Sequence, residues 1–190
     1  MSAPDEATVR RLVKQAVDRA LGPEPGAKSA PAPAAAPRLV APKRVALGAD
    51  HGGYPLKEVL KRAIAEDLGW DVYDCGTHST DAVDYPDFAA AVAREVASGR
   101  AALGVVVDAA GIGSTMAANK IAGVRCALCH DDKTVLNARL HNDANVLALG
   151  ANVVHRGAAT RLVRLFLTTE FEGGRHERRV RKIMALEGGR

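Results

Sequence analysis

The chain has 190 residues, of which 47% are hydrophobic and 25% are charged, and its formal net charge is +4. This composition is that of a soluble domain with a sizeable core, and the length leaves some residues outside that domain. Dispersed arginines and few aromatic residues argue against nucleic-acid binding, and no apolar run approaches the ~20 residues that a membrane-spanning helix needs. The N-terminus also lacks the continuous apolar stretch of a secretory signal.

Three cysteines, Cys75, Cys126 and Cys129, are a small and odd number, which indicates reduced thiols and a cytoplasmic location. Cys126 and Cys129 form a Cys-x-x-Cys pair. No second pair accompanies it, and it falls in a strand-like stretch. We therefore expect neither a metal site nor a redox role for these thiols.

Residues 1–21 are predicted to be a docking or targeting segment. Over residues 5–21, apolar side chains recur at helical spacing and charged side chains take the other face. Gly22 and Pro23 end this helix. Residues 22–42 then contain six of the nine prolines and many alanines, which is typical of a semi-extended linker.

An isolated helix of this length is marginal in water, so the segment needs a surface on which to dock. That surface is either its own domain, a sister subunit or an outside partner. A short amphipathic helix on an Ala/Pro-rich linker resembles the encapsulation peptides of bacterial microcompartment cargo. The resemblance implies a shell protein as partner for residues 5–21, and the microcompartment lumen as location.

Residues 43–190 are predicted to form an α/β domain. Short apolar strands are expected at 44–48, 70–73, 103–107, 124–129 and 146–149. Helices are expected at 55–68, 85–98, 131–140, 158–171 and 176–186, with a short one ending near 118. Strands that alternate with helices predict a parallel sheet covered on both faces, with ligands bound beyond the carboxyl ends of the strands.

The stretch 103–120 combines a buried strand, an acid and a glycine turn. Asp108 ends the strand, Gly111 and Gly113 allow a tight turn, and Ser114 or Thr115 can cap the next helix. Backbone N–H groups in such a turn favour an anion, either a phosphate or an enolate oxygen. Asp108 can move protons beside it. An ordinary strand-to-helix turn with an incidental acid explains the same residues.

Three further polar clusters follow along the chain, at 49–54, 141–145 and 173–179. Together with the turn they supply an acid/base pair, an anion site and two arginines, which suits a phosphorylated small molecule. Neither glycine-rich turn has the dinucleotide or P-loop spacing, so no nucleotide cofactor is expected.

These clusters resemble the ribose-5-phosphate isomerase B/galactose-6-phosphate isomerase family. The matching stretches are 45–54 (VALGADHGGY), 84–89 (DYPDFA), 111–113 (GIG) with 117–120 (AANK), 141–150 (HNDANVLALG) and 171–180 (FEGGRHERRV). They extend from Arg44 to about Ile183. The resemblance implies a Rossmann-like three-layer α/β/α fold and a dimer or tetramer with shared active sites. It also implies aldose–ketose isomerisation of a sugar phosphate, through a cis-enediolate and without a metal or other cofactor.

The resemblance also implies roles for individual residues. The catalytic group comprises Asp108 as base, His141 for opening the sugar ring and Asp50 for contacting the ring oxygen or a hydroxyl. The residues implied to bind the enediolate and the sugar hydroxyls are Gly111, Ile112, Gly113, Ser114, Asn142 and Tyr85. Those implied to bind the phosphate are His51, Arg175 and Arg179.

Three positions depart from the family pattern. Asp108 stands where the family's usual base is a cysteine, and Ala110 replaces a threonine. Asn152 takes the place of an arginine after the fifth strand. The leading interpretation is ribose 5-phosphate/ribulose 5-phosphate isomerisation. The alternatives are an isomerase of another sugar phosphate and a catalytically weak binding or scaffold protein.

Overall fold

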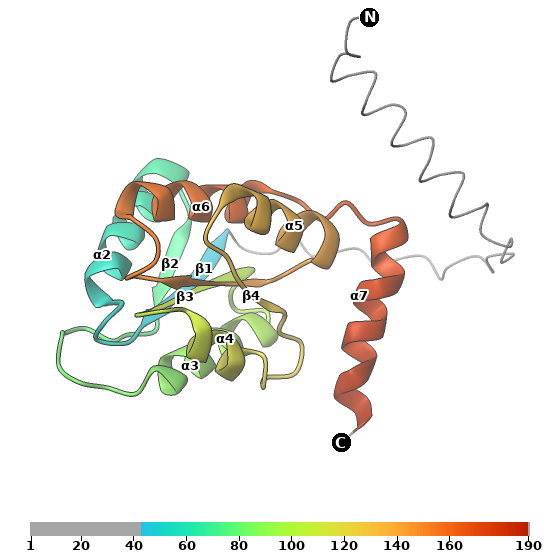
Figure 1. The fold of residues 1–190 in the computed structure, drawn as a ribbon, viewed down its shortest axis with the longest axis horizontal. Coiled ribbons are helices and arrows are strands. Elements are labelled where there is room, and N and C mark those ends of the chain that lie inside the picture. The colour runs from blue at the N-terminus through green and yellow to red at the C-terminus, as the bar shows by residue number, and fades with distance from the viewer. Residues whose placement is uncertain (1–42, 190) are drawn as a thin grey trace, which may run out of the picture. The chain divides into compact units, whose positions relative to one another are not determined.

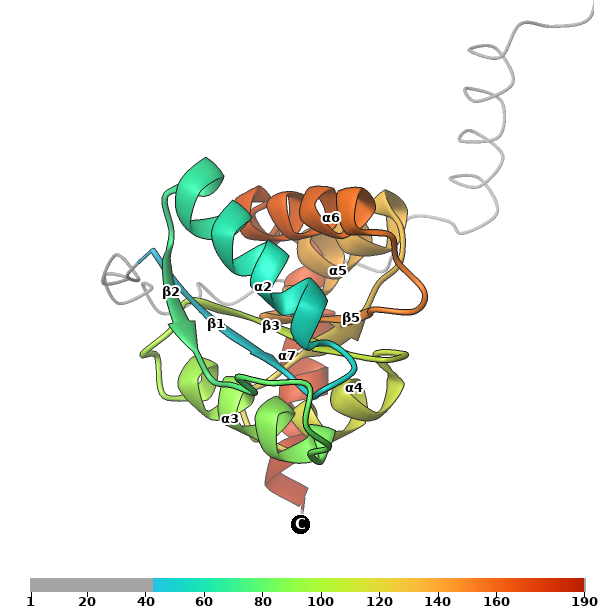
Figure 2. The ribbon, with the colours of Figure 1, turned by 90° about the vertical axis from the view of Figure 1, so that its left-hand side faces the viewer.

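A computed structural model describes residues 43–189, which form a five-stranded parallel sheet covered by helices on both faces (Figures 1 and 2). The sheet order is β2-β1-β3-β5-β4. The elements are β1 (Arg44–Ala49), α2 (Tyr54–Arg62), η1 (Ala63–Asp67), β2 (Asp71–Asp74), α3 (Tyr85–Ala97), β3 (Leu103–Asp108), α4 (Ile112–Ala118), β4 (Cys126–Leu128), α5 (Asp132–Asn142), β5 (Val146–Gly150), α6 (Arg156–Thr168), α7 (Arg175–Ala185) and η2 (Leu186–Gly189). The predicted α/β/α architecture is confirmed. The predicted helix and linker at residues 1–42 lie outside the described part of the chain.

The core forms on both faces of the sheet because neighbouring residues of a strand point in opposite directions. On β3, Val105 and Val107 join the cluster under α2, α5 and α6, whereas Val106 joins the cluster over α3 and α4. All six residues of β3 are buried. The continuous apolar run in the sequence therefore marks a central strand, as predicted.

Two elements depart from the sequence prediction. The fourth strand, expected over 124–129, is limited to β4 at the sheet edge. The helix expected over 55–68 changes after Arg62 into a π-helical turn, η1. Both altered segments lie outside the polar clusters predicted from the sequence.

Lys57 is fully buried on α2 and forms an ion pair beneath the sheet edge. Its Nζ atom lies 2.7 Å from Oδ1 of Asp74 and 2.7 Å from the carbonyl oxygen of Thr77. Lys61, which is 40% exposed, holds Oδ2 of Asp74 at 2.6 Å. Burial alone would raise the pKa of Asp74, but hydrogen bonds from Lys57, Lys61 and the Gly76 N–H together lower that pKa to about 2.

Asp74→Asn is expected to reduce the free energy of unfolding by about 3 kcal/mol at neutral pH, because it removes the nearer of two carboxylates from the buried Lys57 ammonium group, leaving that group with Glu58 at 3.3 Å. A lowered folded pKa stabilises the protein above the unfolded value of 3.8. The stabilisation of the natural protein is therefore lost as pH falls from about 4 to about 2. Over that range, the difference in free energy of unfolding between the natural protein and Asp74→Asn should become smaller. Urea unfolding at pH 7, 4 and 3 measures this. Lys61→Met is the control, with an expected loss below about 1 kcal/mol, and a loss as large as that of Asp74→Asn would contradict the assignment.

Helix α7 lies beside the sheet rather than on either face (Figure 1). Arg125 attaches it to the segment before β4 through a 3.1 Å contact with the sulfur of Met184. The carboxylate of Glu187, just beyond α7, accepts hydrogen bonds from the Gly123 N–H at 2.9 and 3.0 Å. These contacts fix the helix that carries Arg175 and Arg179.

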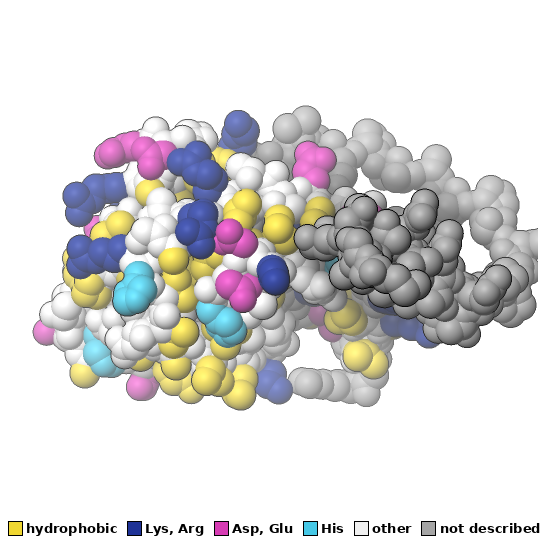
Figure 3. Space-filling model, turned by 45° about the horizontal axis from the view of Figure 1, so that its top comes forward, with side chains coloured by type: hydrophobic (Ala, Val, Ile, Leu, Met, Phe, Trp, Pro, Cys, Tyr) yellow, Lys and Arg dark blue, Asp and Glu magenta, His cyan; other side chains and the backbone are white. Residues whose placement is uncertain are grey.

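The face that α2, α5 and α6 cover is electrostatically mixed. Basic and acidic side chains are interspersed on its coloured part (Figure 3), unlike the continuous basic stripe that nucleic-acid binding uses. Among residues 43–189, no helix is both long enough and apolar enough to cross a membrane.

Candidate active site

The turn after β3 is built around the carboxylate of Asp108, which is 5% exposed. Its Oδ1 atom accepts hydrogen bonds from the backbone N–H groups of Ala110, at 2.8 Å, and Gly111. Its Oδ2 atom accepts one from the Ser114 N–H at 3.0 Å. Gly111 has a φ of 79°, a left-handed conformation that lets the chain fold back around the carboxylate. The turn therefore holds an anion that belongs to the chain itself.

Helix α4 begins directly after this turn, at Ile112, with Gly111 as its N-cap. The prediction that Ser114 or Thr115 caps the helix is wrong, because the Asp108 carboxylate satisfies N–H groups of the turn and first helical turn. The Ser114 hydroxyl is buried and has no hydrogen-bond partner among the described residues. The N–H groups of Ile112 and Gly113 come first in the helix and so lack an intrahelical acceptor.

Asp50 and His51 follow the neighbouring strand at the same edge. Ala49 pairs with Val107 in the sheet, which sets the residues after β1 beside those after β3. Asp50 is buried, and its Oδ1 accepts a 2.8 Å hydrogen bond from the Gly53 N–H. His51 is exposed, and its Nδ1 contacts the backbone of Val83.

Tyr85 lies directly against Gly113. A Cβ atom on Gly113 would come within 2.5 Å of the Tyr85 ring, so only glycine permits this contact. Tyr85 is 41% exposed and Ile112 is 52% exposed. We call Asp50, His51, Tyr85, Asp108 and residues 111–114 the carboxyl-edge cluster, because they gather where β1 and β3 end.

A second cluster lies at the amino ends of the strands. Helix α5 ends at Asn142, shortly before β5 begins at Val146, so His141 and Asn142 are at the start of that strand. Glu172, which precedes α7, is joined to the same place by a hydrogen bond from its N–H to the Leu140 carbonyl. We call His141, Asn142, Glu172, Arg175, His176 and Arg179 the amino-edge cluster.

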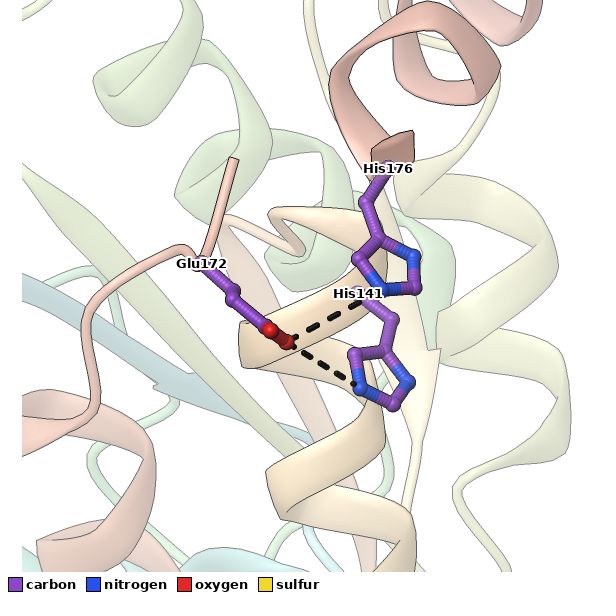
Figure 4. A group of neighbouring side chains, drawn as sticks. All are labelled: His141, Glu172 and His176. Carbon is purple, nitrogen blue, oxygen red and sulfur yellow. Dashed lines mark ion pairs between the residues drawn. The ribbon is translucent and has the colours of Figure 1, made fainter. Parts of the chain in front are cut away.

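Figure 4 shows the centre of the amino-edge cluster. The rings of His141 and His176 are stacked, with centroids 4.2 Å apart and planes 7° from parallel. Their Nε2 atoms lie 3.5 and 3.8 Å from Oε2 of Glu172. Burial, with the nearby charges of His141 and Arg175, lowers the pKa of His176. The partly exposed ring of His141 thus stacks on the buried His176 ring, whose own neutral form is favoured.

Two histidines and a glutamate are ligand types that transition metals accept, and these three groups lie within 4.8 Å of one another. Stacked rings, however, direct their nitrogen lone pairs side by side instead of toward one point. Metal coordination requires convergent lone pairs, so the arrangement suits proton transfer and hydrogen bonding better than it suits a metal ion.

Arg175 and Arg179 are exposed and lie four residues apart on α7, so they share a helix face as predicted. No carboxylate of the described residues lies within ion-pair distance of either one. Both guanidinium groups are therefore available to an external anion.

Within one chain, the carboxyl-edge cluster and the amino-edge cluster lie at opposite ends of the parallel strands. β3, which has six residues, lies between them, and a strand rises about 3.3 Å per residue, so they are roughly 15–20 Å apart. The prediction that ligands bind beyond the carboxyl ends of the strands does not fit 141–145 and 173–179, which lie at the amino ends. The reason is that helices return antiparallel to the strands, and their ends come back to the opposite edge. A single chain thus carries two separated half-sites.

A cavity of about 630 Å³ lies beside the amino-edge cluster. It is lined by the edge strand β4, part of α5 and Ile183 of α7, and its polar lining includes Asn137 and Asn142. It does not reach the carboxyl-edge cluster.

The three cysteines are free thiols with raised pKa values. Burial raises the pKa of Cys75 to about 12, of Cys126 to about 12 and of Cys129 to about 11. Cys126 packs under one face of the sheet and Cys129 under the other, so the pair does not converge. Protonated, separated thiols are poor nucleophiles and poor metal ligands.

Sequence reasoning missed Asn137, Glu172 and His176 as members of a site. Asn137 and His141 are four residues apart on α5, and so are Glu172 and His176 near α7. The spacing could have paired Asn137 with His141, since side chains at i and i+4 are neighbours on a helix. Glu172 precedes α7, so no helical spacing indicated its contact with His176. Arg139 on α5, although charged, is buried and donates hydrogen bonds to the carbonyls of Ala144 and Thr169.

Comparison with known proteins identifies close relatives of the described domain. The Ribose/Galactose Isomerase family matches residues 45–183. The putative sugar phosphate isomerase YwlF of Bacillus subtilis is 42% identical over 150 residues, covering 76% of this chain and 97% of YwlF. Ribose-5-phosphate isomerase B of Escherichia coli is 41% identical over 145 residues, covering 76% of this chain and 97% of that protein.

Solved structures agree with these relatives. Ribose-5-phosphate isomerase B of Clostridium thermocellum superposes with a TM-score of 0.75 and 43% identity, covering 77% of this chain and 98% of that one. The Mycoplasma genitalium enzyme with bound ribulose-5-phosphate gives a TM-score of 0.73 and 39% identity, covering 76% of this chain and 96% of that one.

Proposed function

The chain belongs to the ribose/galactose isomerase family, as an aldose–ketose isomerase of sugar phosphates, and we propose that it interconverts ribose 5-phosphate and ribulose 5-phosphate. The observation that carries this proposal is the likeness of nearly the whole described domain to ribose-5-phosphate isomerase B, including a structure with bound ribulose-5-phosphate. Both sugars share the remote phosphate that Arg175 and Arg179, two exposed arginines on one helix face, can bind.

The carboxyl-edge cluster supplies the proton transfer. Isomerisation moves a proton between the two carbons of a cis-enediolate, so one base must remove it and return it. Both lone pairs of Asp108 Oδ1 are occupied by N–H donors, whereas Oδ2 accepts only one, from Ser114. Oδ2 of Asp108 is the base in this scheme. The N–H groups of Ile112 and Gly113 receive the enediolate oxygen, and Tyr85 lies beside them.

The amino-edge cluster supplies ring opening and phosphate binding. His141 acts on the sugar ring, and Asn142 binds hydroxyls. Asp50 contacts the ring oxygen or a hydroxyl from the carboxyl edge. Arg175 and Arg179 clamp the phosphate, with His51 from the other cluster. Binding energy from the phosphate then orients the reacting carbons.

These two groups of residues cannot meet one substrate within a single chain, since the sheet separates them. We infer a homodimer, alone or paired into a tetramer, in which the carboxyl-edge cluster of one copy faces the amino-edge cluster of its partner. Two such sites per dimer follow from twofold symmetry.

Turnover of ribose 5-phosphate and of galactose 6-phosphate by the full chain tests the assignment. We expect a higher kcat/KM with ribose 5-phosphate and deuterium incorporation from heavy water into the product. Preference for galactose 6-phosphate would transfer the proposal to that substrate, and no turnover with either would overturn it.

The second candidate is a sugar-phosphate-binding homologue with little catalysis, or an isomerase of another sugar phosphate. The observation behind it is that the Asp108 carboxylate occupies turn N–H groups that would otherwise face the substrate. Ala110 and Asn152 add to it by departing from the family pattern. Micromolar binding of ribose 5-phosphate by calorimetry without turnover would favour the binding protein.

Residues 5–21, with the linker 22–42, support a further proposal that the enzyme is microcompartment cargo and acts in the lumen. The amphipathic pattern of residues 5–21 and the Ala/Pro-rich composition of the linker support this proposal, and both lie outside the described residues. Fusing residues 1–42 to a fluorescent protein in shell-producing cells tests this: punctate fluorescence is expected, and diffuse fluorescence counts against a shell partner.

A further inference from the structure

We propose that Asn137 is a positioning residue that determines which ring nitrogen of His141 carries the proton. This inference rests on the proposed function only for its catalytic consequence. Asn137 lies one helical turn before His141 on α5, and its Nδ2 atom is 3.0 Å from Nδ1 of His141. What this contact means depends on which way the Asn137 amide points.

The backbone settles that orientation through Asn142. Nδ2 of Asn142 lies 3.1 Å from the carbonyl oxygen of Asn137, and a carbonyl oxygen can only accept a hydrogen bond. The amide nitrogen of Asn142 must therefore be the atom at this position. The same nitrogen lies 2.9 Å from Oδ1 of Asn137, so that atom is the acceptor and Nδ2 of Asn137 is left to face His141.

The Asn137 NH₂ group is a donor only, so Nδ1 of His141 has to accept from it. A neutral imidazole with an accepting Nδ1 carries its proton on Nε2. The Nε2 atom lies 3.5 Å from Oε2 of Glu172, a negative group that favours an N–H on that side. Two independent neighbours thus select the same tautomer.

The other ionisable groups around His141 come from α7 and the segment before it. His176 stacks on the ring, and its own Nε2 accepts a 3.3 Å hydrogen bond from Nε of Arg175. Arg175 adds positive charge and Glu172 negative charge beside the imidazole. The Glu172 side chain is 59% exposed, so a substrate oxygen can displace its carboxylate from Nε2 of His141.

The Nε2–H tautomer gives His141 a defined task. It donates a hydrogen bond to a substrate oxygen as a neutral imidazole, a use of histidine known from another sugar-phosphate isomerase. A second proton on Nδ1 would point at the NH₂ group of Asn137, and two hydrogen-bond donors would then face each other without an acceptor. Asn137 therefore selects Nε2 as the nitrogen that carries the proton and donates it in a hydrogen bond.

Two-bond ¹H–¹⁵N spectra of the full chain, labelled on histidine, test the tautomer without any substrate. His141→Gln identifies the His141 signals among those of the six histidines. We expect a protonated Nε2 and an unprotonated Nδ1 at neutral pH. In Asn137→Asp, a carboxylate accepts from Nδ1, so Nδ1 becomes protonated and protonation of the ring persists to higher pH. A protonated Nδ1 in the natural protein, or an unchanged spectrum in the variant, would overturn the proposal.

The pH profile of kcat/KM tests the catalytic consequence. Asn137→Asp should lower kcat/KM about tenfold at neutral pH and move the acidic limb of the profile to higher pH. The control is Arg164→Glu, which changes charge at an exposed position of α6 that faces α2 and η1, and which should leave both readouts unchanged. A switched tautomer with an unchanged profile would refute the catalytic role. Absence of turnover in the natural protein would count against the proposed function and not against the tautomer, which is measured separately.

Discussion

Asp50→Ala and His141→Ala, each inactive alone, are expected to regain about one quarter of the natural turnover when equal amounts are co-expressed. Random pairing makes about half of the dimers mixed. Each mixed dimer has one site with both changes and one site with neither, because Asp50 lies in the carboxyl-edge cluster and His141 in the amino-edge cluster. Ribose 5-phosphate turnover by the purified mixture measures the recovery.

The matched control combines two variants of the same cluster, His141→Ala and Asn142→Ala. Their mixed dimers have one change in each site, so turnover should stay at background. Differently tagged copies show whether mixed dimers form. Formation of mixed Asp50→Ala/His141→Ala dimers without recovery would show that the two clusters do not form one site.

Asp108→Asn is expected to lower kcat by about 10²–10⁴-fold, the usual contribution of a general base. The amide retains an oxygen acceptor for the turn, but its NH₂ group cannot take a proton from the substrate. Deuterium exchange from heavy water into the substrate should fall with kcat, because both depend on the same proton removal.

Two further variants separate catalysis from folding. Asp67→Asn makes the same chemical change at an exposed residue of η1 and should leave kcat unaffected. Asp108→Cys introduces the base type that the family pattern has here, and should exceed Asp108→Asn by at least about tenfold. If Asp108→Asn keeps full turnover with its thermal stability intact, another residue is the base.

The fold was predictable because its signals are local. The apolar run at 103–107 is long enough for a buried strand, and the glycines at 111 and 113 mark the turn after it. The alternation of such strands with amphipathic helices is sufficient for a parallel sheet covered on both faces. The departures were the position of element ends, as with the short β4 at the edge of the sheet, and the π-helical turn η1.

The site was less predictable, because its contacts join residues that are distant in sequence or depend on side-chain direction. The sequence pattern marked Asp108 as an acid beside an anion-binding turn. It did not indicate that the carboxylate would itself accept the turn's N–H groups. Likewise the stack of His141 on His176 depends on how α7 lies against α5, and nothing local to either helix specifies that.

The Asp108 carboxylate in the turn after β3 has a consequence for inhibition by small cellular anions. An empty glycine turn of this kind attracts free phosphate and sulfate, which then compete with the substrate's own charge. Here the Asp108 carboxylate already neutralises part of that attraction and repels other anions. Competition by small anions should therefore act where the substrate's phosphate is proposed to bind, at Arg175 and Arg179 with His51, and leave the proton-transfer end of the site undisturbed.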